Sequence, residues 1–442
     1  MMRQTKRMFR TGMLIVSAVS VAALAACSGK ETKTADPAVD TSKPAASEPV
    51  KLVFYNLAET VLPADQFKLY IEEPIKKKYP HISFDYIQGD TKEKTIEKLV
   101  ASGVVPDIVT GGPSSLFDFM NVGLTGDMNP LISKYKFDLG RLDEQAVSFF
   151  KGYSTKGELI SLPVTSDQNV LYYNKDIFDK FGVAYPKDGM TWDDAYELTK
   201  KVTRSESGVN YRGIDVQRGY LTYNQLSLPY VDQGTEKPVF NNDGWKSLFA
   251  MMQKLYAIPG NEYKNTGQDD FIKNQTLAMF ASYNIIMLLK DIPKSFNWDL
   301  VTLPTFSQKP NTGLAPFPQH MLVTATSKHK DNAFHVLETM LTDDVQMARG
   351  RDAGIAPAIT KQSVQEQFMK GVGFAEGKNV GAFFKLQFAA PRKGTPYDKL
   401  AITEVSNGLT AVLQGKKDIN TALRDAEEQS IKKIEEEKAT KK

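Results

Sequence analysis

The sequence predicts an α/β fold, because strand patterns and helix patterns alternate along its first ordered stretch. Residues 50–55 combine β-branched and aromatic side chains, and residues 81–87 alternate apolar and polar side chains with the period of two that is typical of a strand. Between and after them, residues 66–78 and 92–101 have helical patterns, the second with its apolar residues on one side. This order is typical of a parallel sheet with helices on both faces.

The chain begins with the pattern of an export signal. Basic residues, Arg3 to Arg10, precede an apolar run over residues 13–26 that is too short and too rich in Ala and Ser to span a bilayer well. The run ends in Leu-Ala-Ala-Cys, and Cys27 is the one cysteine of the chain. This pattern resembles the lipobox of bacterial lipoproteins, which implies that Cys27 is lipidated and becomes the new N-terminus. The alternative is an ordinary secretory cleavage site that happens to contain a cysteine.

The charge of the chain gives no reason to expect a nucleic-acid partner. Removing residues 1–26 removes four of the 55 Lys and Arg and none of the 52 Asp and Glu, so the remainder carries 51 − 52 = −1. No later segment has the pattern of a membrane span, since polar residues interrupt the apolar stretch 277–289. Residues 28–49 are small, charged or proline, which predicts a disordered tether from Cys27 over residues 27–49.

Polar and aromatic residues follow the first predicted strands at their carboxyl ends. Tyr55 and Asn56, with Glu59 nearby, close the first strand, and the loop 111–115 closes the strand 106–110. Ligands of open α/β sheets bind at the carboxyl ends of the strands. We therefore expect Tyr55, Asn56, Glu59 and, in the loop, Gly112 and Ser114 to contact a ligand. For Tyr55 the alternative is packing in the core.

Further elements follow from the same reasoning. Residues 157–164 and 170–178 read as strands, and residues 205–275 read as loops and short helices. Helices are expected at residues 116–122, 191–202, 242–256, 332–341 and 418–438, and strands at residues 298–304 and 321–323. Thr191 is a suitable cap for the helix that begins with Trp192.

An ordered set of short patterns is similar to the family 1 extracellular solute-binding proteins. The pieces that carry the resemblance are residues 104–109, 121–124, 157–164, 170–178, 191–196, 276–280, 321–328 and 354–357, in family order within residues 50–423. The resemblance implies a two-lobe periplasmic-binding-protein-like fold, each lobe a sheet flanked by helices, with the ligand cleft between the lobes. It also implies a sugar ligand, an ABC permease as partner and no enzymatic activity. Lobe 1 is expected at about residues 50–160 plus part of 290–345, and lobe 2 at about 165–285 plus part of 346–442.

The resemblance also suggests where the ligand binds. Asp167 and Gln168 lie in a loop where the family has ligand-facing polar groups, although a solvated turn is the alternative. Tyr283 and Asn284 stand where the family commonly has a stacking Trp, so Tyr283 is a candidate platform. The remaining candidates are Phe317 and His320, which precede a strand that lines the family's cleft. For His320 the alternative is a core histidine.

The sequence supports no catalytic or metal-binding constellation. It contains no phosphate-binding Gly-x-x-x-x-Gly-Lys loop, no His-Glu-x-x-His and no Gly-x-Ser-x-Gly elbow. We therefore expect no cofactor, no metal and a monomeric binding protein, lipid-anchored at the extracellular face of the membrane. The alternatives that stay open are a secreted glycan hydrolase or lyase, a cell-wall adhesin or scaffold, and a receptor for a peptide or a polyamine. A polyamine site would use Glu59, Asp107 and Asp167.

Overall fold

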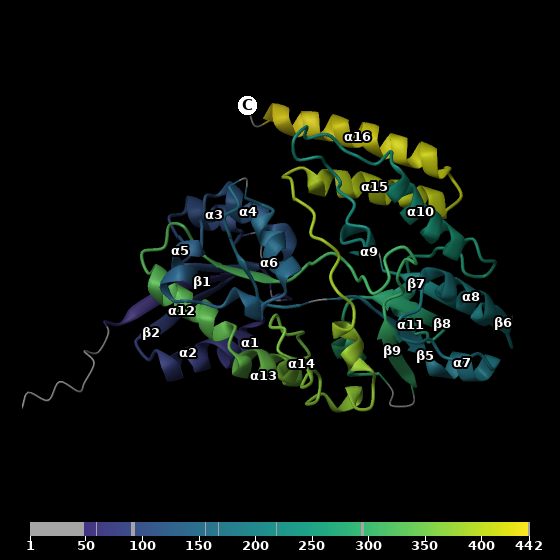
Figure 1. The fold of residues 1–442 in the computed structure, drawn as a ribbon, viewed down its shortest axis with the longest axis horizontal. Helices are drawn as coiled ribbons and strands as arrows, with labels where there is room; N and C mark the ends of the chain where they lie inside the picture. Colours follow the sequence, from purple (N-terminus) through teal and green to yellow (C-terminus); the bar gives the residue numbers. More distant parts are fainter. Residues whose placement is uncertain are drawn as a thin grey trace, which may run out of the picture. The chain divides into compact units, whose positions relative to one another are not determined.

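The computed structural model describes residues 48–58, 60–89, 93–154, 156–166, 168–217, 219–292 and 296–440. The predicted export signal, most of the tether, Cys27, Glu59 and Asp167 lie outside these residues. The described chain forms two five-stranded sheets, each covered by helices, so the predicted α/β fold of two sheets flanked by helices is confirmed (Figure 1).

The first sheet has the strand order β2-β1-β3-β10-β4. Its strands are β1 (Val50–Asn56), β2 (Ile82–Gln88), β3 (Ile108–Gly111), β4 (Leu162–Pro163) and β10 (His320–Val323). β1 runs parallel to β2 and β3, as expected, but β10 is antiparallel to both β3 and β4. The parallel arrangement expected for the first three strands is therefore confirmed, and β10 and β4 extend the sheet through antiparallel pairs. β10 begins at His320, which pairs with Gly111 at the carboxyl end of β3, so β10 runs antiparallel to β3.

Helices pack around this sheet and bury one apolar core. They are α1 (Ala64–Phe67), η1 (Lys68–Glu72), α2 (Glu73–Lys78), α3 (Ile96–Ala101), η2 (Pro113–Ser115), α4 (Leu116–Asn121), α5 (Asn129–Lys134), η3 (Leu139–Arg141), α6 (Glu144–Lys151), α12 (Lys330–Met340), α13 (Asp343–Ala353) and α14 (Gln362–Gln365). Phe54 of β1, Leu322 of β10 and Leu337 of α12 are all fully buried in this core, which we call the first core. The segment from residue 320 to α14 therefore completes a core that the N-terminal segment begins.

The second sheet has the strand order β6-β7-β8-β5-β9. Its strands are β5 (Val170–Asn174), β6 (Arg204–Glu206), β7 (Val209–Val216), β8 (Leu277–Ser282) and β9 (Trp298–Thr302). β5 is antiparallel to β8 and β9, β7 is parallel to β8, and β6 pairs with β7 as an antiparallel ribbon. The prediction of only loops and short helices after residue 205 is wrong for β7. β7 is buried over most of its length, but its charged residues Arg212 and Asp215 interrupt the apolar pattern by which a buried strand is predicted.

Helices cover both faces of the second sheet. They are α7 (Lys175–Phe181), α8 (Trp192–Val202), α9 (Gly219–Thr222), α10 (Asp243–Tyr256), α11 (Gly267–Ile272), η4 (Ile286–Leu289), η5 (Gly373–Ala375), η6 (Val380–Phe384), α15 (Asp398–Leu413) and α16 (Ile419–Thr440). Thr191 caps α8 in a capping box with Asp194, as predicted. In Figure 1, α15 and α16 (yellow) lie side by side with α10 next to them.

The two faces of this sheet bury different clusters because side chains alternate along each strand. Leu171 and Tyr173 pack with α8, α10, α15 and α16 in what we call the second core. Val170 and Tyr172 face the other way and pack with Phe271 of α11 and its neighbours. The continuous apolar pattern of β5 in the sequence therefore reflects burial on both faces.

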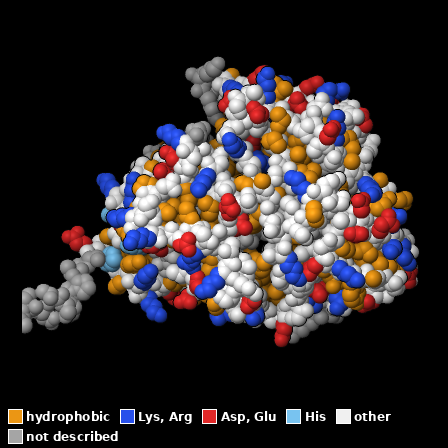
Figure 2. Space-filling view, in the orientation of Figure 1, with side chains coloured by type: hydrophobic (Ala, Val, Ile, Leu, Met, Phe, Trp, Pro, Cys, Tyr) orange, Lys and Arg blue, Asp and Glu red, His pale blue; other side chains and the backbone are white. Residues whose placement is uncertain are grey.

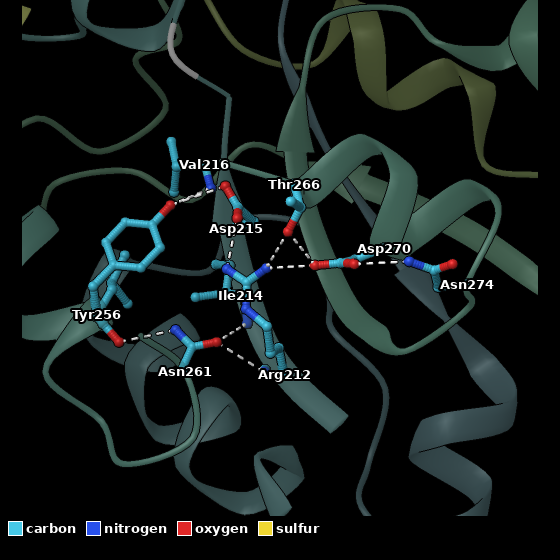
Figure 3. A network of polar contacts seen from close by, with 11 residues as sticks. Arg212, Ile214, Asp215, Val216, Tyr256, Asn261, Thr266, Asp270 and Asn274 are labelled. Atoms are coloured by element: carbon cyan, nitrogen blue, oxygen red, sulfur yellow. Dashed lines mark hydrogen bonds and ion pairs between the residues drawn. The ribbon is translucent and has the colours of Figure 1, made fainter. Parts of the chain in front are cut away.

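A buried polar network fastens α11 to β7 (Figure 3). The Arg212 guanidinium donates to Asp215 at 2.6 Å and to Asp270 at 2.8 Å, and the side chain of Arg212 is only 3% exposed. Tyr256 donates to the other oxygen of Asp215 at 3.0 Å, and Thr266 donates to Asp270 at 2.6 Å. Each carboxylate thus has a cation and a neutral donor, which is the condition for burying such charges without a large penalty.

On the face drawn in Figure 2, side chains of one charge sign form no separate patch. Figure 2 shows basic and acidic side chains interspersed there, in agreement with the charge of −1 (51 − 52) calculated for residues 27–442. Among the described residues, no helix combines the length and the apolar character needed to cross a bilayer.

Candidate functional site

The chain passes between the two sheets three times, and these connections lie together. Residues 164–169 lead from β4 to β5, and residues 303–319 lead from β9 to β10. The third connection begins after α13 with residues 354–357, contains α14, and then reaches η5.

The carboxyl ends of β1, β3 and β8 adjoin these connections. His320, at the start of β10, pairs with Pro163 of β4 and with Gly111 at the end of β3, which lies beside the end of β1. Val170, at the start of β5, pairs with Ser282 at the end of β8.

Short backbone contacts join the three connections to one another. The amide of Val164 donates to the carbonyl of Gln319 at 2.8 Å, and the amide of Ser166 donates to the carbonyl of Ala356 at 3.1 Å. Thr165 forms an isolated bridge with Pro357. The three connections, which contact one another through these residues, are thus the covalent link between the two sheets, and such element-terminal residues are where hinge motions are absorbed.

Gln168, a predicted ligand residue, lies in the first connection and is 4% exposed. Its Oε1 accepts from the amide of Leu314 at 3.2 Å, and Gly313 lets it approach, since a Cβ there would lie 2.6 Å from that oxygen. Its Nε2 is buried with no partner among the described residues. Because buried donors are normally paired, this amide is suited to bind a ligand or a water molecule.

At the end of the first sheet, the predicted residues mostly serve packing. Tyr55 is fully buried and meets the edge of Phe119 at a ring separation of 6.3 Å, which favours the core alternative. Asn56 is also fully buried, and its amide donates to the carbonyls of Ala58 and Leu62 at 2.8 and 2.7 Å. Its Oδ1 has no partner in the described part of the chain. Asn56 therefore shapes the loop after β1 and keeps one free acceptor.

His320 is a core histidine by its surroundings. It is fully buried, its Nε2 lies 3.2 Å from the carbonyl of Gly112, and its Nδ1 lies 2.8 Å from the hydroxyl of Ser161. A carbonyl only accepts, so Nε2 carries the proton and Nδ1 accepts from Ser161. Burial lowers the pKa of His320 to about 3, so the ring is neutral at physiological pH. The His320 ring thus connects β10 with the segment at β4 and with the loop after β3. Ser114, the predicted ligand residue in that loop, is exposed.

Tyr283 and Asn284, at the end of β8, differ in their roles. The ring of Tyr283 is 38% exposed, and its hydroxyl lies 3.4 Å from the Oε1 of Gln268, a weak hydrogen bond. Asn284 is partly buried and donates to the carbonyl of Gly354 at 2.8 Å, which ties β8 to the third connection. Tyr283 thus stays available as a platform, whereas Asn284 has a structural task.

Phe317 stacks on an aromatic residue that the sequence did not single out. Its ring lies 4.7 Å from that of Tyr223 with an angle of 24° between the planes, and both side chains pack against the second core. The amide of Ala315 donates to the carbonyl of Tyr223 at 2.9 Å, which holds the second connection beside the segment after α9. Together the two rings form a flat aromatic pair of the kind on which the C–H face of a sugar packs.

Two further residues lie close to this pair, and sequence reasoning missed both. Tyr153, after α6, packs on Phe117 and Phe149 and belongs to the first core. Arg392, before α15, donates to Asp398 and lies over the ring of Tyr230 at 4.4 Å, in the second core. The two cores meet here, because the Cε1 of Tyr153 is 2.7 Å from the place where Gly394 would carry a Cβ. No motif marks these residues, which come from distant parts of the chain.

The arrangement suits the binding of a ligand. It offers an aromatic pair, an exposed tyrosine and polar atoms without partners, all near the connections between the sheets. In the described residues, no group of three or more His, Cys, Asp or Glu side chains is placed to hold a metal ion. His320, which is neutral and enclosed, has no neighbouring carboxylate among its described hydrogen-bond partners.

Comparison with known proteins agrees with this arrangement. A binding protein of Brucella abortus is 22% identical over 376 residues, which cover 78% of this chain and 84% of the relative. Among solved structures, an ABC substrate-binding protein from Listeria monocytogenes in complex with cycloalternan superposes with a TM-score of 0.69 at 20% identity, over 88% of this chain and 99% of the other. The cyclic alpha-maltosyl-1,6-maltose binding protein from Arthrobacter globiformis gives a TM-score of 0.70 at 17% identity, over 86% and 98%.

These superpositions establish the fold, which confirms the expected resemblance to two-lobe binding proteins. The family follows from the sequence itself. The model of the bacterial extracellular solute-binding proteins matches residues 61–347, well over half of the chain. This protein therefore belongs to the bacterial extracellular solute-binding protein family.

Proposed function

We propose that this protein is a lipid-anchored receptor of a bacterial ABC importer that binds a carbohydrate and delivers it to a membrane permease. One observation carries the sugar assignment. Where the two cores meet, the stacked rings of Tyr223 and Phe317 lie near polar groups, such as the Gln168 amide, that lack a partner among the described residues. A sugar needs this combination, because its C–H faces pack on rings while its hydroxyls need hydrogen bonds. Two solved relatives support the same interpretation, one in complex with cycloalternan and one named as a cyclic alpha-maltosyl-1,6-maltose binding protein.

The proposed cycle needs only binding and closure. The ligand binds between the lobes, and contacts made to both lobes favour the closed form over the open one. The permease recognises that form and receives the ligand unchanged. In this proposal residues 1–26 are the export signal, residues 27–49 tether the receptor, and residues 50–442 form the solute-binding region, which acts as a monomer.

A thermal-shift screen over mono- and oligosaccharides tests the sugar assignment. A ligand that binds only the folded protein stabilises it by about 2.7 kcal/mol at a concentration 100 times its Kd. We expect a selective rise of the melting temperature with one class of sugar, and recovery of that sugar unaltered by chromatography. A screen in which only peptides or polyamines stabilise the protein would contradict the sugar assignment. Conversion of the sugar into products would favour the hydrolase or lyase instead.

The adhesin alternative differs from the receptor in its response to ligand. Small-angle scattering should show the receptor becoming more compact when the stabilising sugar is added, because the lobes close on it. A scaffold has no reason to change shape. An unchanged scattering curve in the presence of a bound sugar would therefore speak against hinge closure.

The lipid anchor is tested by the change Cys27→Ala. We expect this variant to leave the membrane fraction for the medium, or to keep its signal uncut, because the lipid chains supply the membrane affinity. Fractionation with labelled palmitate gives the measurement, and Ser28→Ala, one residue later, is the control that should stay lipidated and membrane-bound. Lipid labelling of Cys27→Ala at the wild-type level would refute the anchor.

A further inference from the structure

Two partly buried tyrosines at the junction of the cores, Tyr153 and Tyr223, differ from several fully buried tyrosines of the chain. The hydroxyls of Tyr172, Tyr220, Tyr230 and Tyr256 each have a hydrogen-bond partner within the protein. No described residue donates to or accepts from the hydroxyl of Tyr153, and the same holds for that of Tyr223. Both hydroxyls therefore have capacity to form hydrogen bonds with a ligand.

Both phenols keep their protons at neutral pH. Burial raises the pKa of Tyr153 well above its usual value, although Arg392 acts against this, and burial raises the pKa of Tyr223 to about 12. Each group can therefore donate one hydrogen bond and also accept one. A sugar hydroxyl, itself both donor and acceptor, is the complementary partner.

The charge around the two phenols is balanced. Arg392, whose side chain is 9% exposed, donates to Asp398, and Thr395 donates to the other oxygen of Asp398 at 2.7 Å. Arg392 lies beside Tyr153, because the Arg392 carbonyl oxygen is 3.7 Å from the place where the neighbouring Gly152 would carry a Cβ. Since the guanidinium already has its counter-ion, Arg392 is not an unpaired cation for a phosphate or carboxylate of a ligand.

We propose that the hydroxyls of Tyr153 and Tyr223, one from each core, bind the same ring of an uncharged sugar, with the Tyr223–Phe317 pair beneath its C–H face. This inference rests on the proposed carbohydrate function and assigns a subsite within it. Tyr153 packs against the first core and Tyr223 against the second, so a sugar ring that binds both hydroxyls contacts both lobes. Contacts of this kind exist only when the lobes are together, and they therefore contribute to closure.

Removing each hydroxyl while keeping its ring tests the subsite. The variants Tyr153→Phe and Tyr223→Phe and the double variant are titrated by calorimetry with cycloalternan and maltotriose, and glucose 6-phosphate serves as the charged probe. Losing one neutral hydrogen bond should weaken the binding of the better neutral sugar by about three- to tenfold in each single variant, and further in the double variant. Tyr196→Phe is the matched control, because the Tyr196 hydroxyl also has no described partner but lies on α8, away from the junction.

The outcomes separate the subsite from the function. Weaker sugar binding in both single variants, with Tyr196→Phe at wild-type affinity and unchanged melting temperatures without ligand, supports the proposal. Wild-type affinity for the sugar in either tyrosine variant overturns the shared subsite while leaving the carbohydrate function intact. Tighter binding of glucose 6-phosphate than of the neutral sugars overturns the uncharged class. A wild-type protein that binds neither these sugars nor any sugar of the thermal-shift screen contradicts the proposed function itself, and the subsite with it.

Discussion

The change Arg212→Met should lower the free energy of unfolding by about 3–5 kcal/mol, because it leaves the buried carboxylate of Asp215 and the partly buried carboxylate of Asp270 without their cation. Asp215 is 4% exposed and depends on Arg212 and Tyr256 for its hydrogen bonds. The network fastens α11 to β7, so its loss affects the packing of the second sheet (Figure 3). Methionine keeps most of the length and apolar contact of the arginine stem, so the loss reports mainly on the charge.

The loss should also depend on pH. Burial raises the pKa of Asp215, and removing Arg212 takes away the charge that opposes this rise. A carboxyl whose folded-state pKa exceeds its unfolded value destabilises the folded form as pH rises through that range. The deficit of Arg212→Met should therefore be smaller at about pH 5 than at about pH 8.

Urea unfolding at both pH values gives the measurement. The control is Arg351→Met, which breaks the pair with Asp352 at the surface, where the side chains are 47% and 43% exposed. Such exposed pairs contribute about 1 kcal/mol or less. A deficit of Arg212→Met no larger than that of the control would contradict the structural role assigned to the network.

His320 should make the protein lose stability in mild acid. Its pKa is lowered to about 3 by burial, against an ordinary value of 6.5. Stability is therefore full above the unfolded value and falls as pH drops below it, by about 1.4 kcal/mol for each pH unit until the folded value is reached. Between about pH 6.5 and pH 4.5 this one side chain accounts for a loss of about 2.7 kcal/mol.

The variant His320→Gln isolates this contribution. It is less stable than wild type at neutral pH, because glutamine cannot reproduce both contacts of the ring with Ser161 and Gly112. Its stability should nevertheless fall less steeply below about pH 6.5 in urea unfolding curves. His329→Gln, at an exposed histidine, should keep the wild-type slope. If the free energy of unfolding fell equally steeply with pH in His320→Gln and in wild type, protonation of His320 would not destabilise the folded protein. His320 would then behave like a solvent-exposed histidine of an open ligand site.

Periodicity in the sequence predicts most elements because burial repeats with the period of each element. The capping pattern at Thr191 located the start of α8 to the residue. The failures have physical causes. β7 was missed because Arg212 and Asp215 neutralise each other inside the fold, which a hydropathy pattern cannot show. The strand expected over residues 157–164 shrinks to Leu162–Pro163, because its partner β10 pairs there only through His320 and Met321.

The candidate site was less accessible to sequence reasoning. Residues at strand ends, such as Tyr55 and His320, were plausible ligand groups, yet the register places them opposite buried neighbours. Tyr153, Tyr223 and Arg392 meet only through the tertiary fold, and nothing in their local sequence distinguishes them from core residues. Gln168, named in advance from the family pattern, keeps a buried amide without a described partner. Asp167, Glu59 and the role of Tyr283 remain predictions.

The threefold passage of the chain between the sheets has a consequence for export. The first sheet pairs β3 and β4 only through β10, whose residues come about 160 positions after β4. The first sheet of a nascent chain therefore cannot be completed until β10 has been synthesised, after the strands of the second sheet. Such long-range strand pairings form slowly. An exported polypeptide must stay unfolded until it has crossed the membrane. The order of the strands along this chain therefore favours late folding of the first sheet.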